Sequence, residues 1–435
     1  MSLSVKKDDK LSDLFLQTKP VPSGLEGFSG LKSEARQILL ERGFPTTKNE
    51  EYKYTNISKR IADSIENPDA PSPISDTSQI ESYRELLASI DGYEVVFNNG
   101  IPDLSQTDMS DAKFDAQLFS AMDASVAGRI GTIEKSEKDA FSALNTLSFS
   151  EGLFINIPDG TVVEKPIVLI HYVQADKNGD CIHPRYFVKS GKTSQATIIE
   201  LTVYTGSQTV FVNALSEWSV APNAHIRHYK LQDGHKDTLE VHNTSADVDR
   251  DATLMSVVLS LQAGMIRNNL SLNLNAGNCE GNMYGLYLLN GKTHVDNHTN
   301  VDHTQPNSDS NELYKGILTD HSRGVFNGKI FVRQIAQKTN AFQQNNNILL
   351  SEDATVNTKP QLEIWADDVK CSHGCTTGQL DEEALFYLRA RGMSKESAKA
   401  LLLYAFAGEV LDKISIEPFK KYCEKIVHER LGGSY

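Results

Sequence analysis

Five short runs with β character recur at nearly constant spacing in the second half of the chain, and this spacing strongly constrains the fold. Their apolar markers follow one another at intervals of roughly 17 residues: Val295, Leu313, Ile330, Ile348 and Ile364. The intervals between them are rich in Asn, Gln, Asp and Gly. A near-fixed period of this length is typical of a parallel β-helix, in which each coil stacks on the previous one. The alternative is a β-sandwich with hairpins, whose strands usually recur every ~8–12 residues.

Strand signals extend well beyond these five runs. Residues 153–160, 166–173 and 196–201 are apolar and bounded by turn residues, and similar runs continue to about residue 370. Roughly 200 residues of strand is too much for one ordinary open sheet. We therefore predict a mainly β fold, with a right-handed parallel β-helix core flanked by N-terminal and C-terminal α-helical regions.

Segments with helical character lie on both sides of this core. The stretch from Ser33 to Arg42 predicts a short helix with a serine at its N-terminal cap. Cap residues followed by apolar residues at helical spacing predict three further helices, which begin near Asp381, Ser394 and Pro418. We expect this C-terminal bundle to close the open sheet edge at the end of the β-helix.

These signals divide the chain into three predicted domains. Residues 1–150 form a mainly helical N-terminal region, residues 151–376 form the β-helix core, and residues 377–435 form the C-terminal helical domain. A chain of 435 residues is long enough for two or three such units.

The charge balance excludes several classes of partner. The chain has 43 basic and 57 acidic residues, for a net charge of −14, and no basic stripe. Such a chain is a poor candidate for binding nucleic acid or an anionic membrane surface. No apolar run approaches the ~20 residues of a membrane helix, and the segment Met1–Lys10 lacks the apolar core of a signal peptide. We expect a cytoplasmic protein that binds neither nucleic acid nor membrane.

The cysteines do not form a disulfide framework. They are odd in number and scattered along a long chain: Cys181, Cys279, Cys371, Cys375 and Cys423. Reduced thiols are the expectation for such a pattern. Cys423 lies on the apolar side of its predicted helix and is expected to be a core thiol.

Cys371, His373 and Cys375 alternate along the chain near the end of the predicted core. If the segment is extended, their side chains share one face, and thiolate and imidazole both bind zinc or iron. A structural site usually needs four protein ligands, however, and Gly374 could break the strand. The alternative is that these small residues simply form a tight exit from the β-helix.

A second group of candidate ligands lies between residues 294 and 303. It contains His294, His298 and His303 together with Asp296 and Asp302. One interpretation is a divalent metal site, because imidazole and carboxylate both bind such ions. The interpretation that we favour is a polar face of the β-helix, on which these side chains bond to one another.

Several enzyme signatures are missing from the sequence. It contains no P-loop, no dinucleotide-binding glycine motif, no HExxH and no GxSxG. The acid pair Asp367 and Asp368 is adjacent, so in a strand the two carboxylates would face opposite ways and would not form a glycosidase pair. We predict that the chain is not an enzyme, and a carbohydrate-active β-helix is disfavoured.

Short motifs between residues 312 and 392 resemble those of one known family. They are Leu313–Gly316, Gly324–Ile330, Ala336–Thr339, Lys359–Ile364, Cys371–Gly374 and Leu385–Gly392. In these motifs the chain resembles the SufB/SufD family of SUF-system iron–sulfur cluster assembly proteins. Ser372 and Gly374 favour the SufD branch, because SufB tends to carry Glu on both sides of the motif histidine. Cys375 departs from the family, whose members commonly have Ala there.

The resemblance implies a non-enzymatic scaffold subunit. Such a chain would pair with a SufB-like subunit and dock a SufC-like ATPase through its C-terminal helices, for which we expect Phe386, Tyr387 and Arg391 to supply contacts. The nascent cluster would form near the interface with the SufB-like subunit. His373 and Cys371 would lie at that site.

The resemblance also bears on cofactors and assembly. It implies no stably bound cofactor in the isolated chain, with iron or a nascent iron–sulfur cluster held at the partner interface. His373, Cys371 and Cys375 would then contact metal only transiently. A flavin in the full complex and a homodimer of the isolated chain remain open. The alternative function is a self-contained metal-binding protein that uses the same three residues.

Overall fold

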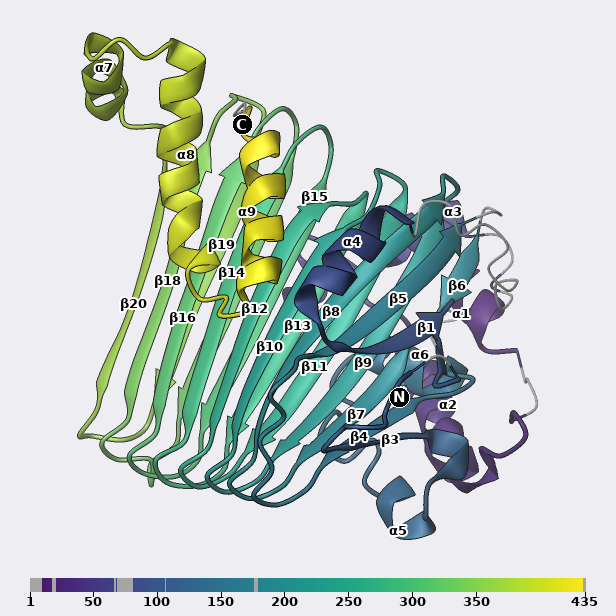
Figure 1. Cartoon of the computed structure of the whole chain (residues 1–435). Coiled ribbons are helices and arrows are strands. Elements are labelled where there is room, and N and C mark those ends of the chain that lie inside the picture. Colours follow the sequence, from purple (N-terminus) through teal and green to yellow (C-terminus); the bar gives the residue numbers. More distant parts are fainter. Residues whose placement is uncertain are drawn as a thin grey trace, which may run out of the picture.

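The chain winds into a parallel β-helix, whose strands form two long sheets that face each other, as Figure 1 shows. The computed structural model describes residues 10–17, 21–65, 68, 81–105, 107–175 and 179–432. Neighbouring strands pair in parallel, except that β1 pairs with β2 and β3 with β4 in antiparallel fashion. The predicted mainly β fold, with a β-helix core and helices at both ends, is confirmed.

Among the described residues, each sheet contains ten strands. The first sheet runs in the order β2 (Ile101–Asp103), β1 (Tyr93–Asn98), β5 (Ile167–Ala175), β8 (Gln195–Gly206), β10 (His225–Asp233), β12 (Thr253–Gln262), β14 (Glu280–Leu289), β16 (Asp309–Leu318), β18 (Asn340–Leu349) and β20 (Lys370–Gly378). The second runs β19 (Thr355–Ile364), β17 (Arg323–Val332), β15 (His294–His303), β13 (Met265–Leu274), β11 (Thr238–Val248), β9 (Val210–Val220), β7 (Arg185–Ser190), β4 (Leu153–Ile157) and β3 (Asp115–Leu118), with β6 (Asp180–Ile182) paired to β9.

The interval that recurs in the sequence is half a coil, not a whole one. Successive runs alternate between the two sheets, so Val295 lies on β15 and Leu313 on β16 of the opposite sheet. Within one sheet, Glu280 of β14 pairs with Asp309 of β16, and Asp309 pairs with Asn340 of β18. The expectation that each run stacks directly on the preceding one is therefore wrong, because every coil contributes one strand to each sheet.

The main core lies between the two sheets and is built from alternate residues of each strand. Val295 and Val301 of β15 point inward, as do Phe326 and Ile330 of β17 and Leu318 of β16. All five are fully buried. The side-chain period of two in a strand places the intervening residues on the outer faces, where helices cover much of both sheets.

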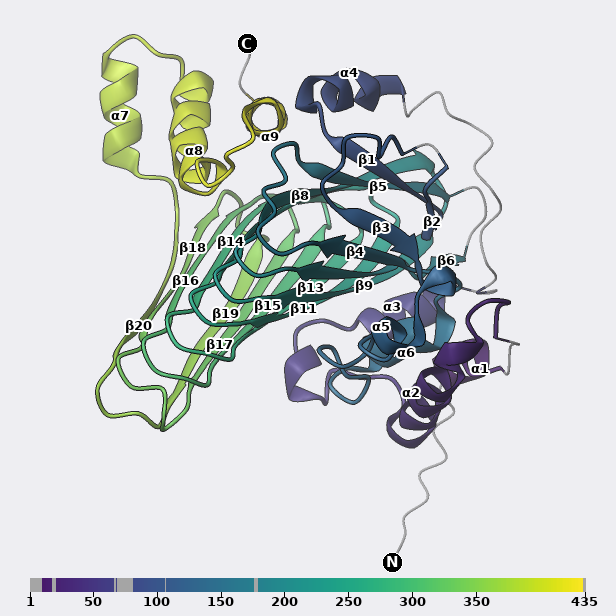
Figure 2. The same ribbon diagram turned by 60° about the horizontal axis from the view of Figure 1, so that its bottom comes forward.

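The N-terminal helices cover the outer face of the second sheet, as seen below the sheets in Figure 2. They are α1 (Lys10–Phe15), α2 (Ser29–Arg42), α3 (Ile57–Ser64), α5 (Ala124–Ala127) and α6 (Ala140–Ser148), with short 3₁₀ turns at Glu26–Phe28, Glu50–Tyr52 and Phe119–Ala121. Helix α2 begins at Ser29, earlier than the predicted Ser33, and ends at Arg42 as expected, because Gly43 adopts a φ of 64°.

Strands from the N-terminal part of the chain also enter the core. β1 pairs with β5 in the first sheet, and β3 pairs with β4 in the second. Helix α4 (Glu81–Ile90) precedes β1 and packs on the outer face of the first sheet. The predicted domain boundaries at residues 150 and 376 stay a prediction.

Of the three C-terminal helices, α8 (Lys395–Leu411) and α9 (Glu417–Arg430) lie on the outer face of the first sheet, α7 (Glu382–Ala390) projects away from it, and the edge of the sheet is left uncovered. The predicted caps at Asp381 and Ser394 are confirmed, and Pro418 lies in the first turn of α9. The expectation that this bundle closes the sheet edge is wrong. The apolar side chains of α8 and α9 pack instead against the outward-facing apolar side chains of the first sheet.

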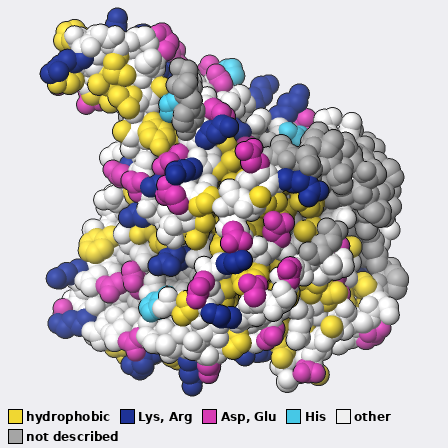
Figure 3. Space-filling view, in the orientation of Figure 1, with side chains coloured by type: hydrophobic (Ala, Val, Ile, Leu, Met, Phe, Trp, Pro, Cys, Tyr) yellow, Lys and Arg dark blue, Asp and Glu magenta, His cyan; other side chains and the backbone are white. Residues whose placement is uncertain are grey.

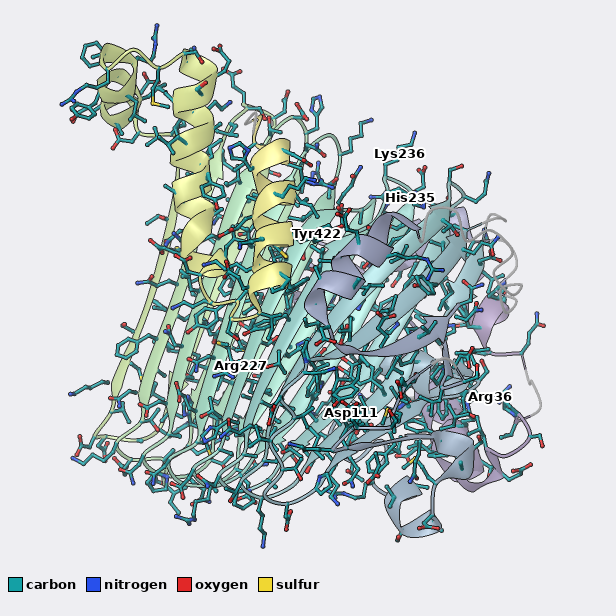
Figure 4. All side chains as sticks on the ribbon, in the orientation of Figure 1. Arg36, Asp111, Arg227, His235, Lys236 and Tyr422 are labelled. Carbon is teal, nitrogen blue, oxygen red and sulfur yellow. The ribbon has the colours of Figure 1, made fainter. Side chains whose placement is uncertain are left out.

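The contact between α9 and the rest of the molecule is aromatic and tight. Phe419 stacks on Tyr229 of β10 with ring centroids 6.3 Å apart. Tyr422 faces α4, where Tyr83 lies 6.3 Å away between ring centroids, and Figure 4 shows Tyr422 between the two helices. Cys423 is fully buried in this cluster, as predicted for a core thiol.

Candidate functional site

The β-helix has an open end formed by its last two strands, β19 and β20. Within the part of the chain that the structure describes, each of these strands pairs with only one neighbour in its sheet. No further coil covers them, so most side chains of β20 are exposed and those of β19 are half-buried or exposed. Figure 1 shows this end on the left, away from the N-terminal helices. The open end therefore presents two strand edges and the mouth of the core.

Cys371, His373 and Cys375 line the inward-facing row of β20. Their neighbours in register on β18 are the fully buried residues Ala341, Gln343 and Asn345. Cys371 is half-buried and packs against the core between the sheets, whereas His373 and Cys375 are exposed. Gly374 does not break the strand, which continues to Gly378. The sequence-based expectation that the three side chains share one face agrees with this register.

The thiol of Cys371 is partly buried at this end of the β-helix. Its burial raises the pKa of the thiol, although a backbone hydrogen bond involving Ala341 opposes that effect. A neutral thiol is a weaker nucleophile and a weaker ligand than a thiolate. Among the described residues, no group of three or more His, Cys, Asp or Glu side chains is arranged to hold a metal ion.

A buried carboxyl lies one further coil behind this row. Glu312 of β16 is fully buried and in register with Gln343 of β18. Its carboxylate accepts a hydrogen bond from Thr299 Oγ1 at 2.6 Å and another from Gln343 Nε2 at 3.1 Å. Burial raises the pKa of Glu312 to about 7, even though both hydrogen bonds lower it. Sequence analysis missed both residues, because all five positions of 343–347 are polar and no alternation distinguishes the inward-facing Gln343.

Asn345 and Asn347, further along the inward face of β18, are also buried and hydrogen-bonded. Asn345 Nδ2 donates to the hydroxyl of Tyr287 at 3.0 Å, and Asn347 Nδ2 donates to Asn345 Oδ1 at 2.8 Å. The Tyr287 hydroxyl in turn donates to Asn347. Buried networks of this kind fix side chains in one arrangement when every member is paired. This network places ordered polar side chains directly behind the exposed strand β20.

The second predicted group of ligands is not one cluster. His294, Asp296 and His298 lie on the outer face of β15, whereas His303 points inward and bonds to Ser308 and Ser310 at 2.7 and 2.9 Å. The metal-site interpretation, which we did not favour, is therefore wrong for His303, which lies on the opposite face from His294 and His298. The reason is the two-residue side-chain period, which puts positions separated by an odd number on opposite faces.

An arginine occupies the centre of the outer part of this group. Arg267 Nη1 lies 2.7 Å from Asp296 Oδ2, and both side chains are buried. His298 Nε2 is 3.0 Å from the other Asp296 oxygen, and its Nδ1 is 3.4 Å from Glu51. Hydrogen bonds from His298 and Lys329 lower the pKa of Glu51 to about 2. These contacts match the polar-face interpretation, in which the side chains bond to one another.

The predicted ATPase-contact residues lie on an exposed helix. Phe386 and Tyr387 of α7 are 73% and 58% exposed. Arg391 donates to the Tyr387 hydroxyl at 2.9 Å, and its guanidinium lies 5.1 Å from the centre of that ring. Figure 3 shows hydrophobic and basic side chains together on α7, which projects from the body of the molecule. Large exposed aromatic residues are typical of protein-binding surfaces.

Comparison with known proteins gives a consistent result. A family model described as "SUF system FeS cluster assembly, SufBD core domain" matches residues 172–406. The chain is 33% identical over 406 residues to the iron–sulfur cluster assembly protein SufD of Escherichia coli K12, covering 91% of this chain and 92% of that protein. It is 31% identical over 395 residues to an iron–sulfur cluster assembly SufBD family protein of Synechocystis, covering 88% and 86%.

A plant relative extends the similarity over almost the whole chain. The chloroplastic protein ABCI7 of Arabidopsis thaliana is 26% identical over 436 residues, covering 95% of this chain and 90% of that protein. The span matched by the family model includes the open end and its Cys371–Gly374 motif. The chain therefore belongs to the SufB/SufD family of SUF-system iron–sulfur cluster assembly proteins, as a SufD-type member.

Proposed function

We propose that this chain is a non-enzymatic scaffold subunit that pairs with a SufB-like subunit through its open end. In this proposal His373 and Cys371 lie where the nascent cluster forms, and iron is cargo of the complex. The observation that carries the proposal is the exposed inward row of β20, which holds imidazole and thiol groups at an uncovered coil. The names of the relatives, which are assembly proteins, support a non-catalytic role.

Two strand edges that no described residue pairs with favour a partner that continues the sheets. The outer edges of β19 and β20 offer backbone N–H and C=O groups, which other chains satisfy by strand addition. A partner with the same β-helix architecture would extend both sheets at once. Its own inward row would then face His373, and a ligand set that is incomplete in one chain would be completed across the interface.

The ATPase is proposed to dock on α7. Phe386, Tyr387 and Arg391 form an exposed surface of aromatic and basic side chains, held together by the Arg391–Tyr387 contact. Aromatic and arginine side chains dominate the binding energy of many interfaces. Helix α7 contacts α8, and α8 packs on the first sheet, so this surface is connected to the scaffold through α8. A cytoplasmic location and a flavin in the full complex remain parts of the proposal.

Purification of the tagged chain from its native cells tests the proposal. Mass spectrometry should identify a SufB-like subunit and a SufC-like ATPase, and iron analysis should find less than one equivalent of iron per chain. A chain that purifies alone with a full equivalent of metal retained after dialysis would instead favour the self-contained metal-binding protein. A chain that purifies only as a homodimer would contradict the SufB pairing.

A further inference from the structure

Gln343 lies directly behind His373 in the interior of the β-helix. The two residues are cross-strand neighbours on β18 and β20, and Glu312 is the neighbour of Gln343 on β16, one coil earlier. All three are on the inward-facing row of their strands. Gln343 and Glu312 are fully buried, whereas His373 at the open end is exposed. The three side chains therefore form a column from the core to the mouth of the β-helix.

Only one end of the Gln343 amide is bonded. Its Nε2 donates to Glu312 Oε1 at 3.1 Å, and the other oxygen of that carboxylate accepts from Thr299. Gln343 Oε1 is buried, and no described residue gives it a hydrogen bond. Buried carbonyl oxygens nearly always have a donor, so this oxygen is an acceptor that awaits one.

The surroundings fix which way the amide points. Nε2 faces Glu312 and donates to its Oε1, so Oε1 of the amide faces away from that carboxyl group. Gly328 of β17 makes room for this arrangement, since a Cβ at that position would lie 2.3 Å from Gln343 Nε2. A side chain at residue 328 would therefore displace the amide.

We propose that Gln343 is a positioning residue for His373, with Oε1 accepting the N–H of one ring nitrogen of that histidine. The inference rests on the proposed function, in which His373 meets iron at the open end. Histidines that bind metal commonly donate their other N–H to a carbonyl or carboxylate, which fixes the tautomer and the ring orientation. In this arrangement Glu312 orients the Gln343 amide through a hydrogen bond, and Gln343 orients the His373 ring. The second ring nitrogen of His373 then carries no proton and can bind iron.

The test compares Gln343→Leu with Gln344→Leu. Gln344 is the next residue of β18 and is exposed on the outer face, so it controls for the same change of side chain. In the complex reconstituted with its SufB-like and SufC-like partners, Gln343→Leu should lower cluster yield about 10-fold or more. Gln344→Leu should leave the yield unchanged. Gly328→Ala, which removes no polar group, provides a second variant if Gln343→Leu does not fold.

A spectroscopic measurement separates positioning from a general structural effect. Nitrogen NMR of the full chain labelled at histidine, with the His373 signals assigned from His373→Ala, reports the tautomer directly. One tautomer should dominate in the wild type, and both should be populated in Gln343→Leu and in Gly328→Ala. An unchanged tautomer ratio and yield in both variants, with His373 still required, would overturn the inference. If His373→Ala also left the yield unchanged, the proposed function would fail, and the tautomer ratio would still decide the Gln343–His373 contact.

Discussion

Lys315 of β16 and Glu409 of α8 form an ion pair, with Nζ and Oε2 2.7 Å apart. The lysine side chain is only 4% exposed, and its Nζ also donates to the carbonyl oxygen of Phe406 at 3.0 Å. The same Nζ lies 4.3 Å from the centre of the Phe406 ring. One buried lysine thus ties the C-terminal helices to the sheet that carries the open end.

Removing this lysine should loosen α8 without unfolding the β-helix. We expect Lys315→Met to destabilise the docked helix by about 1–3 kcal/mol, chiefly through the lost charge-assisted hydrogen bond to Phe406, because Glu409 is largely exposed. Hydrogen exchange in α8 and α9 should therefore become faster. Lys421→Met, which removes an exposed pair with Glu417, is the matched control and should change nothing. Equal exchange rates in both variants would contradict the account.

Arg185 and Glu217 form a fully buried ion pair at the junction of the second sheet and the N-terminal region. Their side chains lie 3.0 Å apart and are 0% and 1% exposed. The Glu217 carboxylate also accepts from the backbone N–H groups of Gly131, Ile133 and Glu134. Breaking such a pair leaves a buried charge without its partner.

Arg185→Met should therefore lower the free energy of unfolding by about 3–5 kcal/mol. Urea denaturation monitored by circular dichroism measures this change. The control is Arg227→Met on the exposed face of β10, which should alter stability by less than about 0.5 kcal/mol. A midpoint for Arg185→Met that coincides with that of the control would show that the pair contributes nothing.

We expect the burial of Glu312 to make the stability of the folded protein depend on pH. Burial raises the pKa of Glu312 to about 7, above its ordinary value, so the folded state holds this proton more tightly than the unfolded state does. The stability that comes from the protonated form is complete below the ordinary pKa of about 4.3 and is lost as the pH rises through 7. Glu312→Gln removes this titration. Its stability relative to the wild type should increase by about 2–3 kcal/mol between pH 5 and pH 8. Parallel pH profiles of the two proteins in urea denaturation would disprove the assignment.

The exposed surface of α7 should bind the ATPase without supporting the fold. We expect the double substitution Phe386→Ser and Tyr387→Ser to weaken binding of the SufC-like ATPase at least ~10-fold, measured by calorimetry. Its melting temperature should stay unchanged because both side chains are exposed. Ile335→Ser, in an exposed turn between β17 and β18, serves as the control. If the double variant binds the ATPase as tightly as the wild type, the docking surface is not on α7.

The fold class could be predicted from the sequence, but the number of strands in one coil and their stacking order could not. Apolar runs separated by polar turns identify strands, yet nothing local to one run says which other run stacks on it. The interval between Leu313 and Ile330 therefore suggested a whole coil, although the two residues lie in opposite sheets. The same limit applies to the C-terminal helices. Their apolar stripe was visible, but the surface that it covers depends on outward side chains of distant strands such as Tyr229.

Residue parity explains what was predicted correctly at the site. The odd-numbered run of Cys371, His373 and Cys375 shares a face because side chains in a strand alternate. The same rule, applied to His294 and His303, would have separated them in advance. Gln343 and Glu312 were beyond reach, because the role of a polar residue inside a β-helix depends on its partner on the neighbouring coil, far away along the chain.

Cluster formation on the reconstituted complex, compared between His373→Ala and Ser372→Ala, tests the central claim most directly. Ser372 is the neighbouring residue on the same strand, is also exposed and lies on the outer face in register with Phe342. The account predicts that His373→Ala reduces cluster yield at least ~10-fold while partner binding is retained, and that Ser372→Ala does not. Equal yields from the two variants would contradict a role for the open end in cluster assembly.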